Sequence, residues 1–346
     1  MECNEKLDMG LGGILMRLGI KPLYETPMGK AYVGDGLDLL KRMPSESIDL
    51  AITSPPFALQ RQKEYGNLDQ NEYVDWLLMF APEVKRVLKK IGSFVLDLGG
   101  AYQKGRPIRS LYNYRILIRL CDEQGWNLAE EFFWFNPSKL PSPIEWVNKR
   151  KIRVKDAVNT VWWFSKTDFP KSDITRVLAP YSERMKTLLR DKEKFYKPKR
   201  RPSGHDISWR FGDNNNGAIP PNLLQIPNTE SNSRYLQCCK LIGIKPHPAR
   251  FPQKFPEFFI KMLTNRGDTV LDFFAGSNTT GAAAESLGRR WIAFEIDQGY
   301  LATSAFRFFE KAEEKVVKSL YKKLMSLTSD ETYKVHRIVQ LQLIDT

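Results

Sequence analysis

The chain has 346 residues, which is long enough to bury a full hydrophobic core in one large domain or two. It carries 53 lysines and arginines against 40 aspartates and glutamates, and this net charge of +13 favours a polyanionic partner. No run approaches the ~18 apolar residues of a membrane-spanning helix, and no apolar signal core lies within residues 1–13. The four cysteines have no metal-ligand spacing, so we expect a reduced, cytoplasmic protein without a metal.

Short apolar runs alternate with amphipathic stretches through the first half of the chain. The runs are rich in β-branched and aromatic residues and predict strands at 31–33, 48–52, 93–98, 128–134 and 158–164. Apolar residues at helical spacing predict helices at 73–90 and 111–124. Strands that alternate with helices indicate an α/β fold, with a mostly parallel sheet covered on both faces.

The second predicted strand leads into the sequence Ser54-Pro55-Pro56-Phe57. The prolines fix the backbone, so the Ser54 hydroxyl and the Pro55 carbonyl form a rigid pair of hydrogen-bond acceptors. Such a pair suits the exocyclic amine of a nucleobase, whose lone pair is delocalised into the ring and must be localised before it reacts. Phe57 suits stacking on a base extruded from a duplex. Taken alone, the motif indicates no more than a proline turn that leaves a strand, and its position relative to a later turn is what favours the chemical interpretation.

Asp97 lies at the end of another predicted strand, 93–98. The carboxyl ends of parallel strands meet at one edge of a sheet, so Asp97 is expected to point to the same edge as Ser54. We expect it to accept a hydrogen bond near the target amine or to be the partner of Ser54; a structural cap is the alternative.

No cysteine follows a proline, which argues against methylation of cytosine C5 through a thiolate.

The segment 171–245 departs from the alternating pattern and has the character of an irregular, basic insertion. Between Lys171 and Arg250 there are 16 lysines and arginines against 7 aspartates and glutamates. The insertion, together with a proline-rich loop and a basic run before it, offers donors for phosphates and base edges. The residues expected to contact nucleic acid are Lys139, Lys149, Arg150, Lys151, Arg200, Arg201 and His205. A solvated loop or face is the alternative interpretation of each group.

The alternation resumes after the insertion. Further elements are predicted as helices at 256–263, 279–286 and 299–324 and as strands at 269–273 and 291–294. Small residues form the turn after strand 269–273, where backbone amides can approach a polar ligand. Glu295 ends the next strand, about 20 residues on, where a carboxylate usually takes ribose hydroxyls. A nicotinamide dinucleotide is disfavoured because Asn278 replaces the central glycine that a pyrophosphate requires.

The order of these motifs, Ser-Pro-Pro-Phe first and the turn at Phe274 and Gly276 later, resembles the β-class of DNA amino-methyltransferases. The resemblance implies the S-adenosylmethionine-dependent methyltransferase fold in circularly permuted order, with a target-recognition insertion. It also implies S-adenosylmethionine as the cofactor, and segment 247–252 resembles the motif near its methionine end. The residues expected to bind the cofactor are Asp35, Thr53, Phe274, Ala275, Gly276, Ser277, Asn278, Thr279 and Glu295.

The first residue of the Ser-Pro-Pro-Phe motif bears on the base that is methylated. In this family Ser usually accompanies cytosine N4, whereas Asp or Asn usually accompanies adenine N6. A closer resemblance, to one cytosine-N4 member over 24–309, implies the site CAGCTG, its inner cytosine as target, and a cognate restriction endonuclease. An adenine-N6 enzyme, a catalytically silent DNA-binding protein of the same fold, and an RNA substrate stay open as alternatives.

These observations predict a monomer with a single methyltransferase domain that the insertion divides. The predicted parts are an N-terminal extension of unknown role (1–23), the catalytic half (24–170), the target-recognition region (171–245), the cofactor-binding half (246–325) and a C-terminal tail (326–346).

Overall fold

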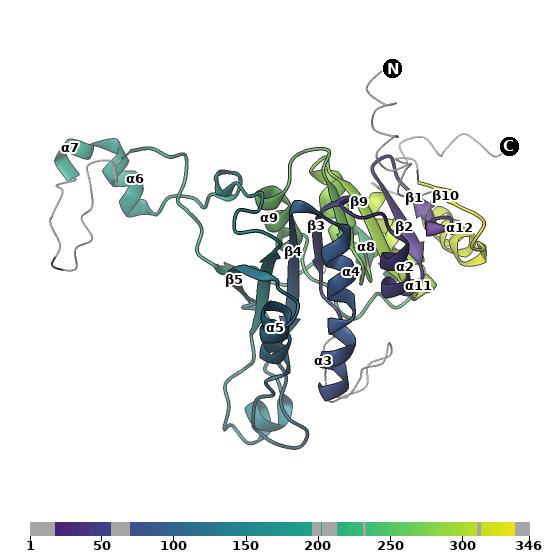
Figure 1. The fold of residues 1–346 in the computed structure, drawn as a ribbon, viewed down its shortest axis with the longest axis horizontal. Coiled ribbons are helices and arrows are strands. Elements are labelled where there is room, and N and C mark those ends of the chain that lie inside the picture. Colours follow the sequence, from purple (N-terminus) through teal and green to yellow (C-terminus); the bar gives the residue numbers. More distant parts are fainter. Residues whose placement is uncertain are drawn as a thin grey trace.

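The computed structural model describes residues 18–56, 70–195, 202, 213–230, 233–309 and 313–335. Ten strands within these residues form one sheet, in the order β10-β1-β2-β9-β8-β3-β4-β6-β5-β7 (Figure 1). Their bounds are β1 Tyr24–Glu25, β2 Gly29–Val33, β3 Ile48–Thr53, β4 Leu88–Gly99, β5 Asn127–Phe135, β6 Val158–Ser165, β7 Leu223–Gln225, β8 Thr269–Asp272, β9 Arg290–Glu295 and β10 Tyr333–Lys334.

The centre of the sheet is parallel. Strands β2, β9, β8, β3 and β4 are neighbours and run in one direction, while β6 is antiparallel to both β4 and β5. The predicted α/β fold with a mostly parallel sheet is therefore confirmed. The carboxyl ends of the five parallel strands lie at one edge, which is where open α/β sheets bind their ligands.

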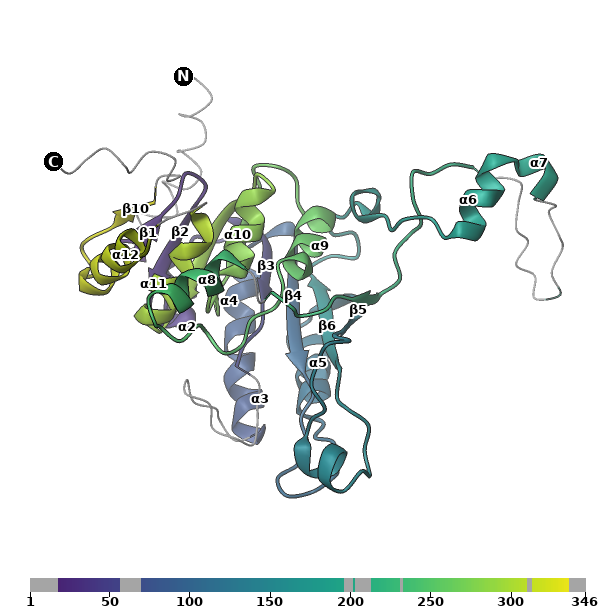
Figure 2. The same cartoon turned by 180° about the vertical axis from the view of Figure 1, so that it is seen from behind.

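Helices cover both faces of the sheet (Figures 1 and 2). Side chains alternate along each strand, so Leu50 and Ile52 enter one apolar core and Ala51 enters the other. The Ala51 core is closed by α2 Gly36–Arg42, α3 Gln70–Leu78, α4 Phe80–Val87 and α5 Tyr112–Asp122. The Leu50 core is closed by α8 Arg234–Leu241, α9 Lys254–Leu263, α10 Thr279–Ser286, α11 Gln298–Ser304 and α12 Glu314–Ser326.

The single helix predicted at 73–90 is wrong in two respects. It is interrupted at Met79 between α3 and α4, and its last residues belong to β4, which begins at Leu88. Pro82 has no N–H to donate to the Leu78 carbonyl, so the helical hydrogen-bond ladder breaks there. The side-chain amide of Gln124 donates to that carbonyl instead, at 3.1 Å.

The helix predicted at 299–324 is also wrong as one element. It comprises α11, the 3₁₀ turn η4 Ala305–Phe308, and α12. Phe309 has an extended backbone that ends the 3₁₀ turn. The Phe308 ring stacks on Trp291, with 5.1 Å between the ring centroids, so tertiary packing overrides the helical spacing here. None of the helices in the described ranges has the length and apolar character that crossing a membrane requires.

Two projections extend from the sheet (Figures 1 and 2). The first, called the arm here, consists of α6 Glu183–Arg190 and α7 Lys192–Phe195, which contain no buried residue. The second is the 136–157 loop, which carries the π-helix η1 Glu145–Lys149. Arg109, in the segment before α5, ties itself to this loop through an ion pair with Asp156 at 2.6 Å. The arm contributes no residue to either core.

Candidate active site

A cavity of ≈ 830 Å³ lies at the carboxyl edge of the parallel strands. Its wall joins segments that are far apart in the sequence: Ser54 after β3, Asp97 near the end of β4, Gly276 after β8 and Glu295 at the end of β9. The sheet order brings these strand ends together, because β3 lies between β8 and β4. Residues from the Ser-Pro-Pro-Phe motif and from the turn after β8 thus line one cavity.

Ser54 and Asp97 are joined directly. The Ser54 hydroxyl donates a hydrogen bond to Asp97 Oδ2 at 3.0 Å, and Asn159 Nδ2 donates to Asp97 Oδ1 at 3.1 Å. Asp97 is 2% exposed. This burial raises the pKa of the Asp97 carboxyl to about 6, while the two hydrogen bonds and the charge of Lys139 act to lower it. Because its proton points to Asp97, the Ser54 oxygen keeps its lone pairs for another donor.

The rest of the Ser-Pro-Pro-Phe motif is only partly visible. Pro55 and Pro56 line the cavity beside Ser54. Phe57 lies outside the described residues, so its predicted stacking on a base stays a prediction.

The turn between β8 and α10 has a backbone that its sequence requires. Gly276 and Asn278 both have φ of 50°, the left-handed region that glycine and asparagine tolerate best. The Asn278 side chain caps α10 by accepting from the Gly281 N–H at 3.0 Å. Gly276 donates its N–H to the Glu295 carboxylate at 2.8 Å, which fixes the turn to the end of β9. Burial raises the pKa of Glu295, although two backbone hydrogen bonds act to lower it.

Thr53 and Asn278, which the sequence assigns to cofactor binding, do not line the cavity. Thr53 is buried, and its hydroxyl donates to Asp272 Oδ1 at 2.7 Å. The Asn278 amide is fully buried and donates to the Tyr24 hydroxyl at 3.0 Å. The structure therefore gives both side chains a supporting position behind the cavity wall.

Asp272 is the central residue of this support, and the sequence analysis missed it. Its carboxylate accepts from Thr53, from the Thr280 hydroxyl at 2.7 Å and from the Phe274 N–H at 3.1 Å. Burial raises the pKa of Asp272 to about 6, and these hydrogen bonds act to lower it. The available signal was an acidic residue at the carboxyl end of a strand, immediately before a turn of small residues.

Other residues expected to bind the cofactor do line the cavity. These are Asp35, Phe274, Ala275, Gly276, Ser277, Thr279 and Glu295. Asp35 has a second role, because one of its carboxylate oxygens caps α2 by accepting from the Leu37 N–H at 2.9 Å. His247, from the predicted motif near the methionine end, also lines the cavity, and its ring packs edge-on against Tyr300.

A buried arginine that the sequence analysis missed supports the turn from behind. Arg307 donates from Nε to the Ser277 carbonyl at 2.6 Å and from Nη2 to the Ser277 hydroxyl at 3.0 Å. Its guanidinium also lies over the Tyr235 ring, 4.8 Å from the centroid. Because burying a charge is costly unless it is paired, these contacts indicate a fixed position for Ser277.

Comparison with known proteins decides the family. A family model described as "DNA methylase" matches residues 48–306, which include Ser54, Asp97, Gly276 and Glu295 of the cavity wall. The chain belongs to the DNA methylase family. The resemblance to the DNA amino-methyltransferases that the sequence indicated is confirmed, and the chain is a methyltransferase of DNA.

Individual relatives of this methylase agree with the family. It is 64% identical over 314 residues to the type II methyltransferase M.PvuII of Proteus hauseri, across 90% of this chain and 93% of that protein. A solved structure titled PvuII DNA methyltransferase (cytosine-N4-specific) superposes with a TM-score of 0.75 at 56% identity, covering 92% of this chain and 98% of that one. The type II methyltransferase M.BamHI of Bacillus amyloliquefaciens is 29% identical, over 80% of this chain and 56% of that protein.

The cavity of the methylase has the chemistry that S-adenosylmethionine requires. Glu295 places a carboxylate on its wall, which suits the hydroxyls of a ribose, and Asp35 adds an acceptor that suits the amine of adenine. Phe274 and Trp76 add aromatic surface that suits adenine. The residues present therefore fit this cofactor. Within the described ranges, no cluster of three histidine, cysteine or acidic residues is arranged to hold a metal ion.

The residues expected to contact DNA fall into three groups. Lys139 lines the cavity itself. Lys149 and Arg150 lie on or beside η1, exposed and paired with Glu145 at 3.3 and 3.0 Å, and Lys151 follows them on the surface. Arg200, Arg201 and His205 lie outside the described residues.

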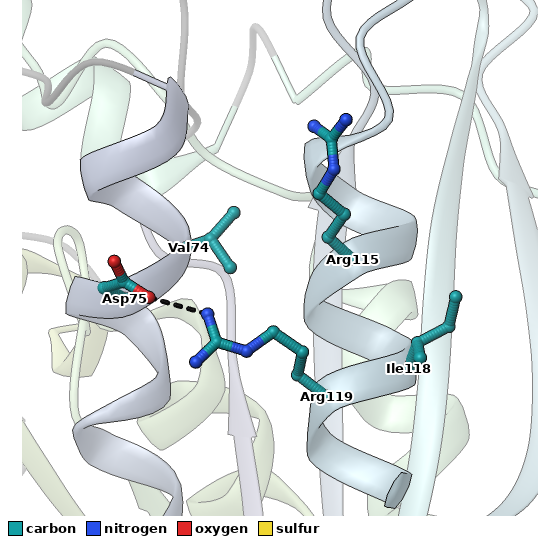
Figure 3. A pocket seen from close by; sticks show the side chains of 5 residues that line it. All are labelled: Val74, Asp75, Arg115, Ile118 and Arg119. Atoms are coloured by element: carbon teal, nitrogen blue, oxygen red, sulfur yellow. Dashed lines mark hydrogen bonds and ion pairs between the residues drawn. The ribbon is translucent and has the colours of Figure 1, made fainter. Parts of the chain in front are cut away.

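A second, smaller pocket of ≈ 270 Å³ lies between α3 and α5 (Figure 3). Arg119 on α5 crosses it to pair with Asp75 on α3, at 2.6 Å. None of the residues predicted from the sequence lines this pocket. The two helices that border this pocket pack on the same face of the sheet.

Proposed function

We propose that this methylase transfers a methyl group from S-adenosylmethionine to N4 of cytosine in duplex DNA. The observation that carries the proposal is the hydrogen bond from Ser54 to Asp97 inside the cavity of a chain 64% identical to M.PvuII. The proposed target is the inner cytosine of CAGCTG, the site that the resemblance described in the sequence analysis implies. The similarity to M.PvuII spans 90% of this chain, which is too much of the chain to leave out the insertion 171–245 that would read the site.

The proposed chemistry starts from a poor nucleophile. The lone pair of the cytosine amine is delocalised into the ring, so the amine attacks weakly until hydrogen bonds draw it toward tetrahedral geometry. Ser54 Oγ and the Pro55 carbonyl would each accept one N–H of that amine. When bound, S-adenosylmethionine supplies an electrophilic methyl group on a sulfonium.

Asp97 has two tasks in this proposal. Above its pKa of about 6 it is ionised and orients the Ser54 hydroxyl, as the 3.0 Å hydrogen bond indicates. The amine must lose a proton once its nitrogen carries the methyl group. Ser54 and Asp97 together offer that proton a path from the amine to a carboxylate. No covalent bond between the enzyme and the base is required.

The cofactor would be held by the side of the cavity that follows β8 and β9. We assign the ribose hydroxyls to Glu295, the adenine to Asp35 and Phe274, and the methionine end to the turn at Gly276. The further cofactor contacts predicted at Ala275, Ser277 and Thr279 belong to the same proposal. Thr53 and Asn278 act through the turn that they support.

The remaining parts of the proposal follow from duplex DNA as the substrate. The target base is extruded to reach the cavity and stacks on Phe57. The insertion 171–245 reads the site, between a catalytic half (24–170) and a cofactor-binding half (246–325) in circularly permuted order. The enzyme works as a monomer in the cytoplasm and protects the site from a cognate restriction endonuclease.

Transfer of labelled methyl groups to matched duplexes tests this function. A duplex with one CAGCTG site is expected to take up label, whereas a duplex with the central dinucleotide inverted to CACGTG is not. Equal labelling of both duplexes would contradict the proposed site. Binding of the first duplex without any labelling would support a catalytically silent DNA-binding protein, and labelling of RNA alone would change the substrate class.

A further inference from the structure

The cavity wall near Asp97 carries a lysine that the reaction described above does not use. Lys139 lines the cavity, and its charge acts on the Asp97 carboxyl. Its backbone is held in place, since its N–H donates to the Asn136 carbonyl at 3.2 Å and its carbonyl accepts from the Lys155 ammonium at 3.3 Å. The Lys139 ammonium itself has no hydrogen bond or ion pair to any residue in the described ranges. It is a held donor without a protein partner there.

Asn136 places a second donor on the same wall. Its Oδ1 accepts two backbone N–H groups, those of Ser138 and Asn228, both at 3.1 Å. Backbone N–H groups only donate, so the accepting atom must be the amide oxygen and the orientation of the amide is fixed. Asn136 Nδ2 is thus left as a donor, and none of the described residues accepts from it.

The cavity therefore has two polarities. The Ser54 and Asp97 side offers acceptors, whereas Lys139 and Asn136 offer donors. An extruded base is read by hydrogen bonds to its Watson–Crick edge. On cytosine that edge presents the N4 amine, which donates, followed by N3 and O2, which accept. Adenine presents a donating amine and one accepting nitrogen, N1, with only a C–H where cytosine has O2. Thymine presents a donating N3–H that would face these donors.

We propose that Lys139 and Asn136 donate hydrogen bonds to N3 and O2 of the extruded base and thereby select cytosine over adenine. This inference rests on the proposed function and names the residues that set its base specificity. It narrows the sequence-based expectation that Lys139 contacts nucleic acid, because it assigns Lys139 to the base and not to a phosphate. Lys149, exposed and paired with Glu145 on the 136–157 loop, has the position expected of a phosphate contact instead.

The test compares Lys139→Met with the wild type on two duplexes. The first carries the CAGCTG site, and the second has adenine in place of the target cytosine, opposite the same guanine. Single-turnover methyl transfer is measured on both at saturating S-adenosylmethionine. Loss of a donor aimed at a substrate acceptor typically costs about 10- to 100-fold in rate. We expect that loss on cytosine and a smaller loss on adenine, so the ratio of the two rates falls.

Two further variants complete the design. Asn136→Asp keeps oxygens that accept from Ser138 and Asn228 but removes the donor, and we expect it to lower the cytosine-to-adenine ratio as well. Lys149→Met is the matched control; it should weaken binding of both duplexes alike and reduce the dependence of affinity on salt. S-adenosylmethionine binding by each variant shows that the fold is intact.

Two outcomes would overturn the inference. An equal loss on both duplexes would mean that Lys139 acts on the DNA backbone or through Asp97 alone, and an unchanged cytosine rate would mean that it does not touch the base. If Lys139→Met fails to fold, the ratio measured with Asn136→Asp decides between the same outcomes. Failure of the wild type to produce N4-methylcytosine would instead refute the proposed function.

Discussion

Two buried carboxyl groups, each with a raised pKa, lie at different parts of the cavity wall or behind it. Asp97 contacts Ser54 in the cavity wall, while Asp272 contacts Thr53 and Thr280 behind the turn between β8 and α10. Burial raises the pKa of each to about 6, so both are ionised at neutral pH and both gain a proton in mild acid. Acid should therefore affect turnover and cofactor binding through separate residues.

Replacing Ser54 tests its role as the acceptor of the target amine. Ser54→Ala should lower kcat by about 100-fold, as expected for the loss of one oriented group in a water-poor site. The dissociation constants for S-adenosylmethionine and for DNA should change little. Ser326→Ala, which removes a surface hydroxyl bonded to the Lys323 carbonyl, is the control and should be neutral. An unaltered kcat in Ser54→Ala would remove Ser54 from the mechanism.

The raised pKa of Asp97 predicts a pH dependence. Above about pH 6 the ionised carboxylate accepts from Ser54 and can take up a proton; below that pH the carboxyl is protonated, accepts from Ser54 more weakly and can take up no further proton. Activity should therefore fall as the pH drops through about 6. Asp97→Asn should be slow and lack this limb, measured at saturating cofactor so that titration of Asp272 does not contribute. Retention of the limb in the variant would assign it to another group.

The sequence predicted which residues meet at one edge of the sheet when those residues lie at the ends of parallel strands. Ser54, Asp97 and Glu295 follow or end parallel strands, so their meeting at one edge follows from the fold. The sequence did not show that the Thr53 side chain is buried behind the cavity wall, because its hydrogen bond to Asp272 joins residues 219 positions apart. Asn159 lies on the antiparallel β6, whose direction the sequence pattern did not reveal.

Among the elements, the turn from β8 into α10 has the tightest requirements. A side chain at Gly276 would strain the backbone, because φ is 50°, and its Cβ would lie 3.0 Å from the His247 ring. In the proposed function, the position of this turn decides where the cofactor carboxylate meets backbone amides.

Substitution of Gly276 and of Gly243 separates the effect of this turn on cofactor affinity from the general cost of a side chain at positive φ. Gly276→Ala should raise the dissociation constant for S-adenosylmethionine by about 10-fold or more, by calorimetry, because the strained turn must shift. Gly243 also has positive φ, at 71°, but has open space around it, so Gly243→Ala should reduce stability by about 1 kcal/mol and leave cofactor affinity unchanged. Equal effects of both changes on affinity would contradict a specific role for the turn.

The elements that were mispredicted show where local patterns fail. Pro82 was visible in the stretch 73–90, but proline is tolerated in the first turn of a helix, and the apolar spacing continued on both sides of it. Strands β1, β7 and β10 have only two or three residues, too few for a periodic signal, and form through pairing with distant segments.

At the scale of the whole molecule, the positive charge and the arm point to the same partner. The arm belongs to the basic insertion. It projects from the sheet, and none of the residues of α6 and α7 is buried. Its chain position and charge were predictable, but its extension away from the sheet was not, because the sequence does not show that the apolar residues of α6 and α7 stay outside both cores.

Charge removal on the arm tests its interaction with DNA. Arg184 and Arg190 are exposed on α6. Changing both to Gln should weaken DNA binding and flatten the salt dependence, by about 0.9 in the slope of log K against log salt for each phosphate that is no longer neutralised. Lys315 and Lys322, exposed on α12, provide a charge-matched control pair that should leave the slope intact. An unchanged slope in the arm variant would place DNA elsewhere.

The central claim, methylation of cytosine N4, is tested most directly by identifying the product. Duplex DNA with a CAGCTG site is methylated with labelled S-adenosylmethionine, digested to nucleosides and analysed by mass spectrometry with chromatographic standards. The account predicts N4-methylcytosine and no other methylated nucleoside. N6-methyladenine would keep the fold and the amine chemistry but contradict the assignment of the base, and 5-methylcytosine would contradict the direct transfer to an amine that Ser54 and Asp97 are proposed to support.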